Sequence, residues 1–173
     1  MCCYRITKYN PNYRNRNGHY TIDDWTSVKD VGEVFNGKKF SFHSYKLCED
    51  SYINTINLIL KENGIAFLQV ESLEKYGFVV YADLNAKKSR QYYDNAFSGQ
   101  AVYLNDINVF ARLILREMLW CKLSMGSSFV HFGYDYYMYI GGVKELKAAE
   151  LAAISQSGLF VEKMDSPYCS KDG

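Results

Sequence analysis

The feature that most constrains the fold is an alternating stretch of side chains that runs from Ser128 to Ile140. With the two-residue period of a β-strand, the even positions from Val130 to Ile140 place only apolar and aromatic side chains on one face. The odd positions place His131, Asp135, Tyr137 and Tyr139 on the other face. One face is therefore expected to build the core. The second face suits recognition, because phenols combine a large contact area with a polar tip.

The length and composition predict one domain. The chain has 173 residues, 48% of them apolar, and a domain of this size buries roughly 70% of its unfolded surface. Both prolines, Pro11 and Pro167, lie near the ends, and no Ser-rich, Gly-rich or single-charge run divides the middle. We therefore expect a single globular domain over residues 1–173, with residues 1–3 and 166–173 as flexible tails.

Hydrophobic periodicity predicts an α+β fold, with a central mixed or antiparallel sheet and three to four packed helices. The pattern indicates helices over residues 28–35, 44–63 and 107–121, and a last helix that ends at Gly158. It indicates strands over residues 4–9, 65–70, 78–84, 128–140 and 159–164, the second and third joined as a hairpin. Residues 87–98 are expected to form a polar loop that carries Tyr92 and Tyr93.

The charge and the cysteine content limit the functions and cellular locations that can be expected. Lys and Arg number 20 against 19 Asp and Glu, and the net charge of +1 disfavours a non-specific nucleic-acid binder. No apolar run approaches the roughly 20 residues of a membrane span, so no membrane partner is expected. Five cysteines without CxxC spacing, and without a secretory leader, predict free thiols and a cytoplasmic location.

The sequence carries no catalytic signature. No set of His, Cys, Asp and Glu residues has the spacing of a metal site, so neither a metal nor another cofactor is expected. A calcium-binding loop that starts at Asp83 is excluded. Lys87 stands at a ligand position of such a loop, and Lys88 stands where the loop requires glycine. His131 and Asp135 lie about 13 Å apart along a strand, too far for a dyad. A small enzyme or ligand-binding protein with a pocket near these two residues stays open as the alternative.

The main expectation is a protein-binding surface made of tyrosines and carboxylates, because aromatic groups anchor interfaces and acids orient partners. Its predicted members are Asp135, Tyr137, Tyr139, Asp23, Asp24, Tyr92 and Tyr93. A second alternative is a nucleic-acid binder that uses basic residues beside tyrosines, namely Arg14, Arg16, Lys87, Lys88 and Arg90.

Three segments carry a family resemblance: Tyr4 to Pro11, Gly18 to Tyr20, and Asp24 to Gly32. In these segments the chain resembles a family of small uncharacterised bacterial proteins, of the general type of the immunity proteins that accompany polymorphic or contact-dependent toxins. The resemblance implies an inhibitor that binds one cognate toxin or effector and performs no chemistry of its own. It assigns no role to any residue. The net charge of +1 is less acidic than that of many immunity proteins that neutralise basic nucleases.

Overall fold

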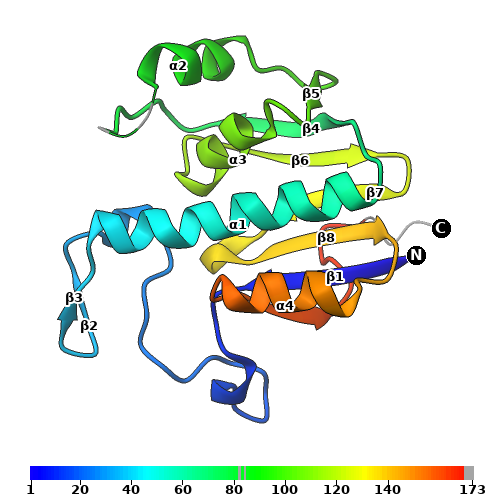
Figure 1. Cartoon of the computed structure of the whole chain (residues 1–173). Helices are drawn as coiled ribbons and strands as arrows, with labels where there is room; N and C mark the ends of the chain where they lie inside the picture. Colours follow the sequence, from blue (N-terminus) through cyan, green and yellow to red (C-terminus); the bar gives the residue numbers. More distant parts are fainter. Residues whose placement is uncertain (82, 84, 170–173) are drawn as a thin grey trace.

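The computed structural model describes residues 1–81, 83 and 85–169 and has an α+β architecture (Figure 1). Its main sheet has the strand order β5-β4-β6-β7-β8-β1-β9, and all neighbouring strands are antiparallel. The predicted fold class is confirmed, and the sheet is antiparallel rather than mixed. In chain order the strands are β1 (Cys2–Thr7), β4 (Phe67–Lys75), β5 (Ala101–Tyr103), β6 (Leu119–Met125), β7 (Ser128–Phe132), β8 (Met138–Val143) and β9 (Phe160–Lys163).

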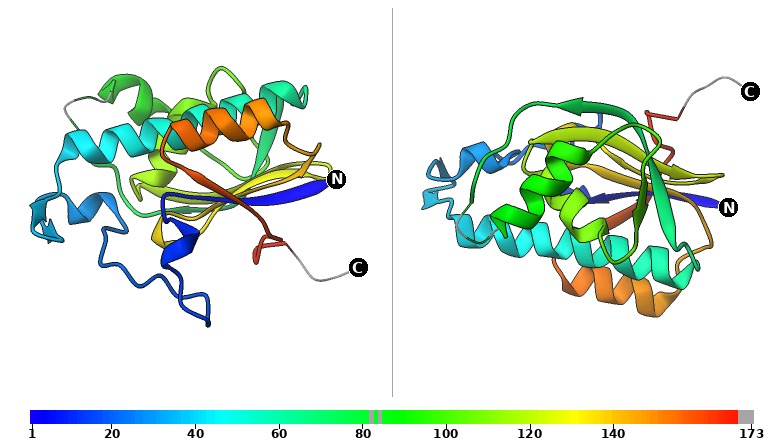
Figure 2. Two further views of the ribbon diagram at one scale, coloured as in Figure 1. Left: turned by 60° about the horizontal axis from the view of Figure 1, so that its bottom comes forward. Right: turned by 90° about the horizontal axis from the view of Figure 1, so that it is seen from above.

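Helices cover one face of this sheet. The described residues form four α-helices, α1 (Phe42–Glu62), α2 (Ala86–Asn95), α3 (Ile107–Leu115) and α4 (Ala148–Gln156). Helix α1 lies along the sheet with α3 and α4 packed on either side of it (Figures 1 and 2). Buried side chains from these helices and from the facing side of the strands form one hydrophobic core. The second sheet face, which points away from α1, is crossed by the chain near both ends (Figure 2).

Helix α1 matches its prediction. Ser41 caps its first turn by accepting a hydrogen bond from the Ser44 amide at 3.1 Å. Its buried stripe includes Tyr45, Tyr52 and Ile56. It ends at Asn63 and Gly64, where Gly64 takes the positive φ of 69° that favours glycine.

A long loop joins β1 to α1. It contains the 3-10 turns η1 (Pro11–Tyr13) and η2 (Val28–Asp30) and a small hairpin of β2 (Val34–Phe35) and β3 (Lys38–Lys39). The helix predicted over residues 28–35 is therefore wrong beyond one capped turn. The Ser27 capping box is present, but Val31 adopts extended backbone and ends the turn.

Other boundaries also differ from the predictions. The strand predicted over residues 78–84 is absent at residues 78–81 and 83, and residues 82 and 84 lie outside the described residues. The predicted hairpin is therefore wrong, and β4 pairs with β5 and β6. The polar segment 87–98 is mostly helix α2, because Asn85 caps its start by accepting from the Lys88 amide. Within the segments predicted to be flexible tails, Cys2 and Cys3 belong to β1 and Ser166 is buried.

Candidate functional site

The predicted strand over residues 128–140 is interrupted by a tight turn at Tyr134–Tyr136, η3, which joins β7 to β8. Asp135 and Tyr136 both have positive φ, 54° and 62°, and the Tyr137 amide donates to the Tyr134 carbonyl at 3.2 Å. Two successive residues of this kind are typical of a hairpin turn whose twist matches its strands. The sequence reading missed it because aspartate tolerates this backbone whereas tyrosine rarely adopts it.

The core holds this turn in its strained form. The ring of Tyr136 is buried and packs against Trp25, Tyr45 and Tyr52, with ring centroids 4.9 to 5.9 Å away. The Tyr52 hydroxyl also donates to the Tyr136 carbonyl at 2.6 Å. Backbone strain of about 1–3 kcal/mol per residue persists only where surrounding structure enforces it, and it clusters at functional sites.

The turn forms the rim of a cleft of about 480 Å³, here called the aromatic cleft. Its volume lies within the range of pockets that hold a small organic group. The walls come from residues 26–29, the end of β4, the connection from α3 to β6, the β7–β8 turn and Tyr168. Seven of the lining residues are aromatic: Tyr76, Trp120, Phe132, Tyr134, Tyr136, Tyr137 and Tyr168.

Two rings of the aromatic cleft stand out in solvent. Tyr134 is 86% exposed and Tyr76 is 61% exposed, although both are large aromatic residues on ordered backbone. Trp120 lies deeper, is half-buried, and donates its indole Nε1–H to the Phe132 carbonyl at 2.9 Å. The cleft therefore combines a fixed aromatic floor with aromatic side chains that a bound group could cover.

The charge of the aromatic cleft is negative. It is lined by three carboxylates, Glu74, Glu117 and Asp135, against one lysine, Lys29, which pairs with Glu117 at 2.5 Å. Within the described residues the Asp135 carboxylate has no hydrogen bond or ion pair. Glu74 meets no cation there and accepts only the Tyr76 hydroxyl, at 2.7 Å. That hydrogen bond raises the pKa of Tyr76 to about 12, because loss of the phenol proton would place a second negative charge beside the Glu74 carboxylate.

The structure divides the predicted tyrosine face. Asp135 and Tyr137 line the cleft, but Tyr139 is only 7% exposed and faces the ring of Tyr168, 6.2 Å away between centroids. Tyr137 is half-buried, and its hydroxyl accepts a hydrogen bond from Arg14 Nη1 at 3.0 Å. The second sheet face does carry both tyrosines. Loop segments cover it, so the prediction of Tyr139 as an exposed contact residue is wrong.

Asp135 lines the aromatic cleft, and His131 does not. His131 is 5% exposed, and its ring stacks on the ring of Phe129 with 4.3 Å between the ring centroids. Its Nδ1 lies 2.9 Å from Ser166 Oγ. Burial, and to a lesser degree the charge of Lys122, lowers the pKa of His131 to about 4. The imidazole is therefore neutral at pH 7 and holds the C-terminal segment on the sheet.

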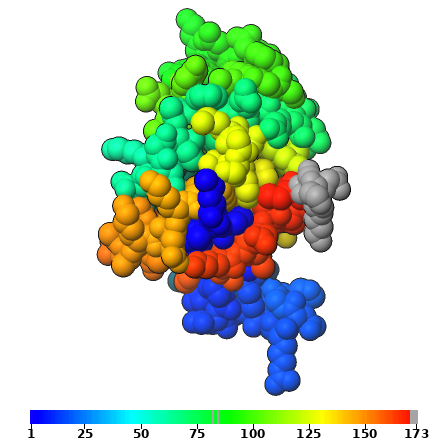
Figure 3. Space-filling model, turned by 90° about the vertical axis from the view of Figure 1, so that its right-hand side faces the viewer, coloured from blue at the N-terminus to red at the C-terminus, as the bar shows by residue number. Residues whose placement is uncertain are grey.

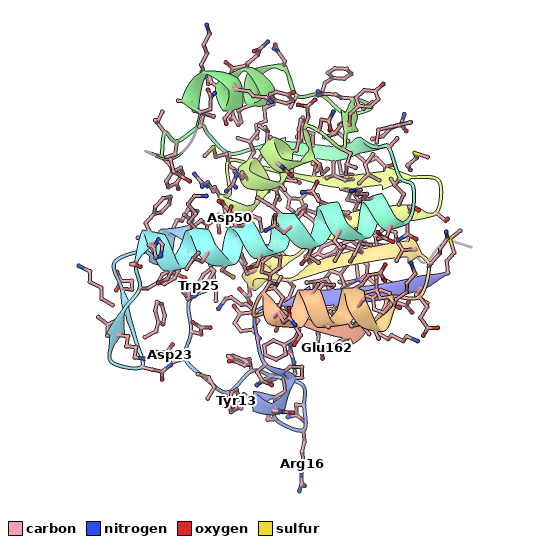
Figure 4. All side chains as sticks on the ribbon, in the orientation of Figure 1. Tyr13, Arg16, Asp23, Trp25, Asp50 and Glu162 are labelled. Carbon is pink, nitrogen blue, oxygen red and sulfur yellow. The ribbon has the colours of Figure 1, made fainter. Side chains whose placement is uncertain are left out.

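The remaining predicted contact residues lie apart from the cleft. Asp24 is half-buried and pairs with Lys8 at 2.6 Å. Asp23, which directly precedes it in the same loop, is exposed (Figure 4). Tyr92 and Tyr93 are half-buried on α2. The seven predicted residues therefore do not form one surface.

The basic residues of the nucleic-acid alternative are also separated. Arg14 and Arg16 belong to the loop after β1, whereas Lys87, Lys88 and Arg90 lie on α2 at the other end of the molecule (Figures 1 and 4). On α2, Lys88 pairs with Asp106 and Arg90 with Asp94.

A charged network beneath α1 is structural. The fully buried Arg116 side chain forms paired hydrogen bonds with Glu49, at 2.6 and 2.7 Å, and with Asp83, at 3.0 and 2.9 Å. The rings of Phe42 and Tyr81 flank its guanidinium group. Hydrogen bonds from Arg116 lower the pKa of Asp83. Arg112, which pairs with Glu49 and Asp50, and Lys46, which pairs with Asp50 and Asp83, complete the network. Three cations thus balance three carboxylates, and the network ties α1 to α3.

Sequence reasoning missed most of the aromatic cleft. Tyr134 was assigned to the core face, and Glu74, Tyr76, Glu117, Trp120 and Tyr168 were not considered as site residues. One local signal existed, because Gly133 and Asp135 bracket Tyr134 and both residue types favour turns. The other members come from distant segments, which no local pattern brings together.

Two absences concern the residues that the structure describes. Among residues 1–81, 83 and 85–169, no group of three or more His, Cys, Asp and Glu side chains is arranged to hold a metal ion. No helix in the same part of the chain has both the length and the apolar character needed to cross a membrane.

Comparison of the chain with protein-family models, curated proteins and solved structures found no significant similarity.

Proposed function

We propose that this chain is a non-catalytic binding protein that holds a basic side chain of a protein partner in the aromatic cleft. The observation that carries the proposal is the β7–β8 turn, which presents the exposed ring of Tyr134 next in sequence to the Asp135 carboxylate. No cation pairs with that carboxylate among the residues that the structure describes. Aromatic faces attract ammonium and guanidinium groups, and a nearby carboxylate adds a charge-assisted hydrogen bond.

We further propose that the partner is a bacterial toxin or effector domain, which the chain would inhibit as an immunity protein. The support is the family resemblance of the first third of the sequence, together with a cleft built for binding. A rigid turn favours such a role, because preorganised groups lose little entropy when a partner docks.

The test is calorimetric titration of the protein with the polypeptide encoded by the gene immediately upstream of its own. We expect Tyr134→Ala and Asp135→Asn each to weaken binding by about 2 kcal/mol or more, as at a hot spot. Asparagine tolerates the backbone of Asp135, so the second change removes charge without disturbing the turn. Tyr137→Ala is less informative, because the Tyr137 side chain also contacts Arg14.

Matched controls are Tyr103→Ala and Asp23→Asn, which make the same chemical changes at exposed residues outside the cleft. We expect both to bind as the unmodified protein does. If the cleft variants bind normally, or if Asp23→Asn weakens binding equally, the cleft is not the contact surface.

A further inference from the structure

The loop after β1 forms a narrow projection, here called the Arg16 hairpin, residues 13–20. Arg14 and Tyr20 pair as an antiparallel bridge, the Asn15 amide donates to the His19 carbonyl, and the Gly18 amide donates to the Asn15 carbonyl, both at 2.9 Å. The Asn15 side chain also accepts from the amides of Asn17 and His19. The projection is therefore internally bonded, and it stands out from the body of the molecule (Figure 3).

The charge of the Arg16 hairpin is positive. Its ionisable side chains include Arg14, Arg16 and His19, and it contains no aspartate or glutamate. The Arg16 side chain extends away from the body (Figure 4), and within the described residues it forms no ion pair or hydrogen bond. The chain therefore presents a solvated guanidinium group on a preorganised support, the type of cation that suits the aromatic cleft.

The Arg16 hairpin and the aromatic cleft are neighbours. Tyr137 lines the cleft, and its hydroxyl accepts the hydrogen bond from Arg14 at the base of the hairpin. Arg14 is also held near Glu162 of β9, with Nη2 3.5 Å from Oε2. A cationic projection thus stands beside an acidic cleft, and the Arg16 side chain points away from the body of the molecule (Figure 4).

We infer that the Arg16 hairpin of one copy enters the aromatic cleft of a second copy, and that the exchange is reciprocal. Adjacent complementary patches suit a two-fold axis, because each patch of one copy meets the opposite patch of the other and both contacts form together. In each contact the guanidinium of Arg16 lies against Tyr134 and pairs with Asp135 and Glu74. This inference rests on the proposed cation binding by the cleft, and it adds a self-association that competes with the protein partner.

The test is sedimentation velocity of the full chain over a concentration series, at low and high salt. We expect a reversible dimer that weakens as salt screens the charges. Arg16→Glu should raise the dimer dissociation constant at least about tenfold, because it places a carboxylate against the cleft. Lys38→Glu makes the same charge change on the exposed β3 strand and should leave the dimer intact.

Mixing variants tests the pairing directly. Arg16→Glu keeps the cleft but loses the cation, whereas a cleft variant with Glu74→Gln and Asp135→Asn keeps Arg16. Each variant alone should dimerise more weakly than the wild-type protein. The mixture can form one intact contact and should associate more tightly than either variant alone. A wild-type protein that stays monomeric up to its solubility limit overturns the inference, as does a dimer that Arg16→Glu leaves unchanged.

These experiments distinguish a failure of the dimer from a failure of the proposed function. If the protein is monomeric but Asp135→Asn weakens binding of the upstream gene product, the proposed function stands and only the dimer is contradicted. The opposite result is also informative. If the dimer responds to the variants as expected but the cleft variants bind the protein partner normally, the proposed function is wrong and the self-association stands. Binding of single-stranded DNA through Arg16, without any dimer, overturns the inference and assigns the hairpin to nucleic acid.

Discussion

At the scale of single residues, His131 makes the stability of the protein depend on pH. Its pKa is about 4 in the folded chain, against about 6.5 for an unperturbed imidazole. Its contribution is therefore complete above about pH 6.5 and is lost as the pH falls towards 4, because only the unfolded chain then gains a proton. We expect the free energy of unfolding to fall by up to about 3 kcal/mol over this range.

Urea denaturation at about pH 7 and about pH 4 measures this change, and His131→Gln should reduce the difference between the two values. His19→Gln is the matched control, since His19 is exposed, and it should retain the full difference. Carboxylates that titrate in the same range affect all three proteins alike. An equal pH dependence in the His131 variant would contradict the assignment.

Residue patterns predicted the core side of the tyrosine stretch well. Val130, Phe132, Met138 and Ile140 are buried as the alternation requires. Tyr134 was misplaced because a turn interrupts the alternation, and the energy that stabilises the turn comes from Tyr136 packing against the distant Trp25. Of the cleft residues around this turn, the sequence pattern pointed to Asp135 and Tyr137 but not to Tyr134, the most exposed of its tyrosines.

At the scale of elements, the boundary between α3 and β6 shows two periodicities in competition. Residues 107–121 are almost uniformly apolar, which predicted one long helix, but from Leu119 onward the burial alternates as in a strand. The helix ends when Glu117 takes a φ of 54° and the Met118 amide donates to the Leu113 carbonyl. This is a Schellman ending with glutamate at the position that glycine usually occupies, so no glycine marked it in the sequence.

Substitutions at Glu117 test the strain at this helix end. Glycine lacks the Cβ that disfavours positive φ, whereas alanine keeps the Cβ, and both remove the exposed ion pair with Lys29. We expect Glu117→Gly to be more stable than Glu117→Ala by about 1 kcal/mol in chemical denaturation. Comparing the two variants cancels the lost ion pair. An alanine variant as stable as the glycine variant would mean that the backbone here carries no strain.

At the scale of the whole molecule, the sequence predicted the fold class but not the arrangement of the strands. The pairing of β8 with β1 joins residues near opposite ends of the chain, such as Ile140 with Tyr4. The aromatic cleft depends on the same long-range order, because its walls come from five separate segments. Local patterns report which side chains are buried along an element, but they carry little information about which elements meet.

One core that spans the sheet and three helices predicts one cooperative unfolding transition. Leu68 on β4 is fully buried near one edge of the sheet, so Leu68→Ala should cost about 2–5 kcal/mol. The whole transition should shift, because tryptophan fluorescence reports on Trp25 and Trp120 while far-ultraviolet circular dichroism reports on all helices and strands. Leu47→Ala, at a side chain that is 58% exposed on α1, is the control and should change stability by less than about 0.5 kcal/mol. If the two signals separate in the Leu68 variant, the β4 side of the sheet unfolds independently and the core is divided.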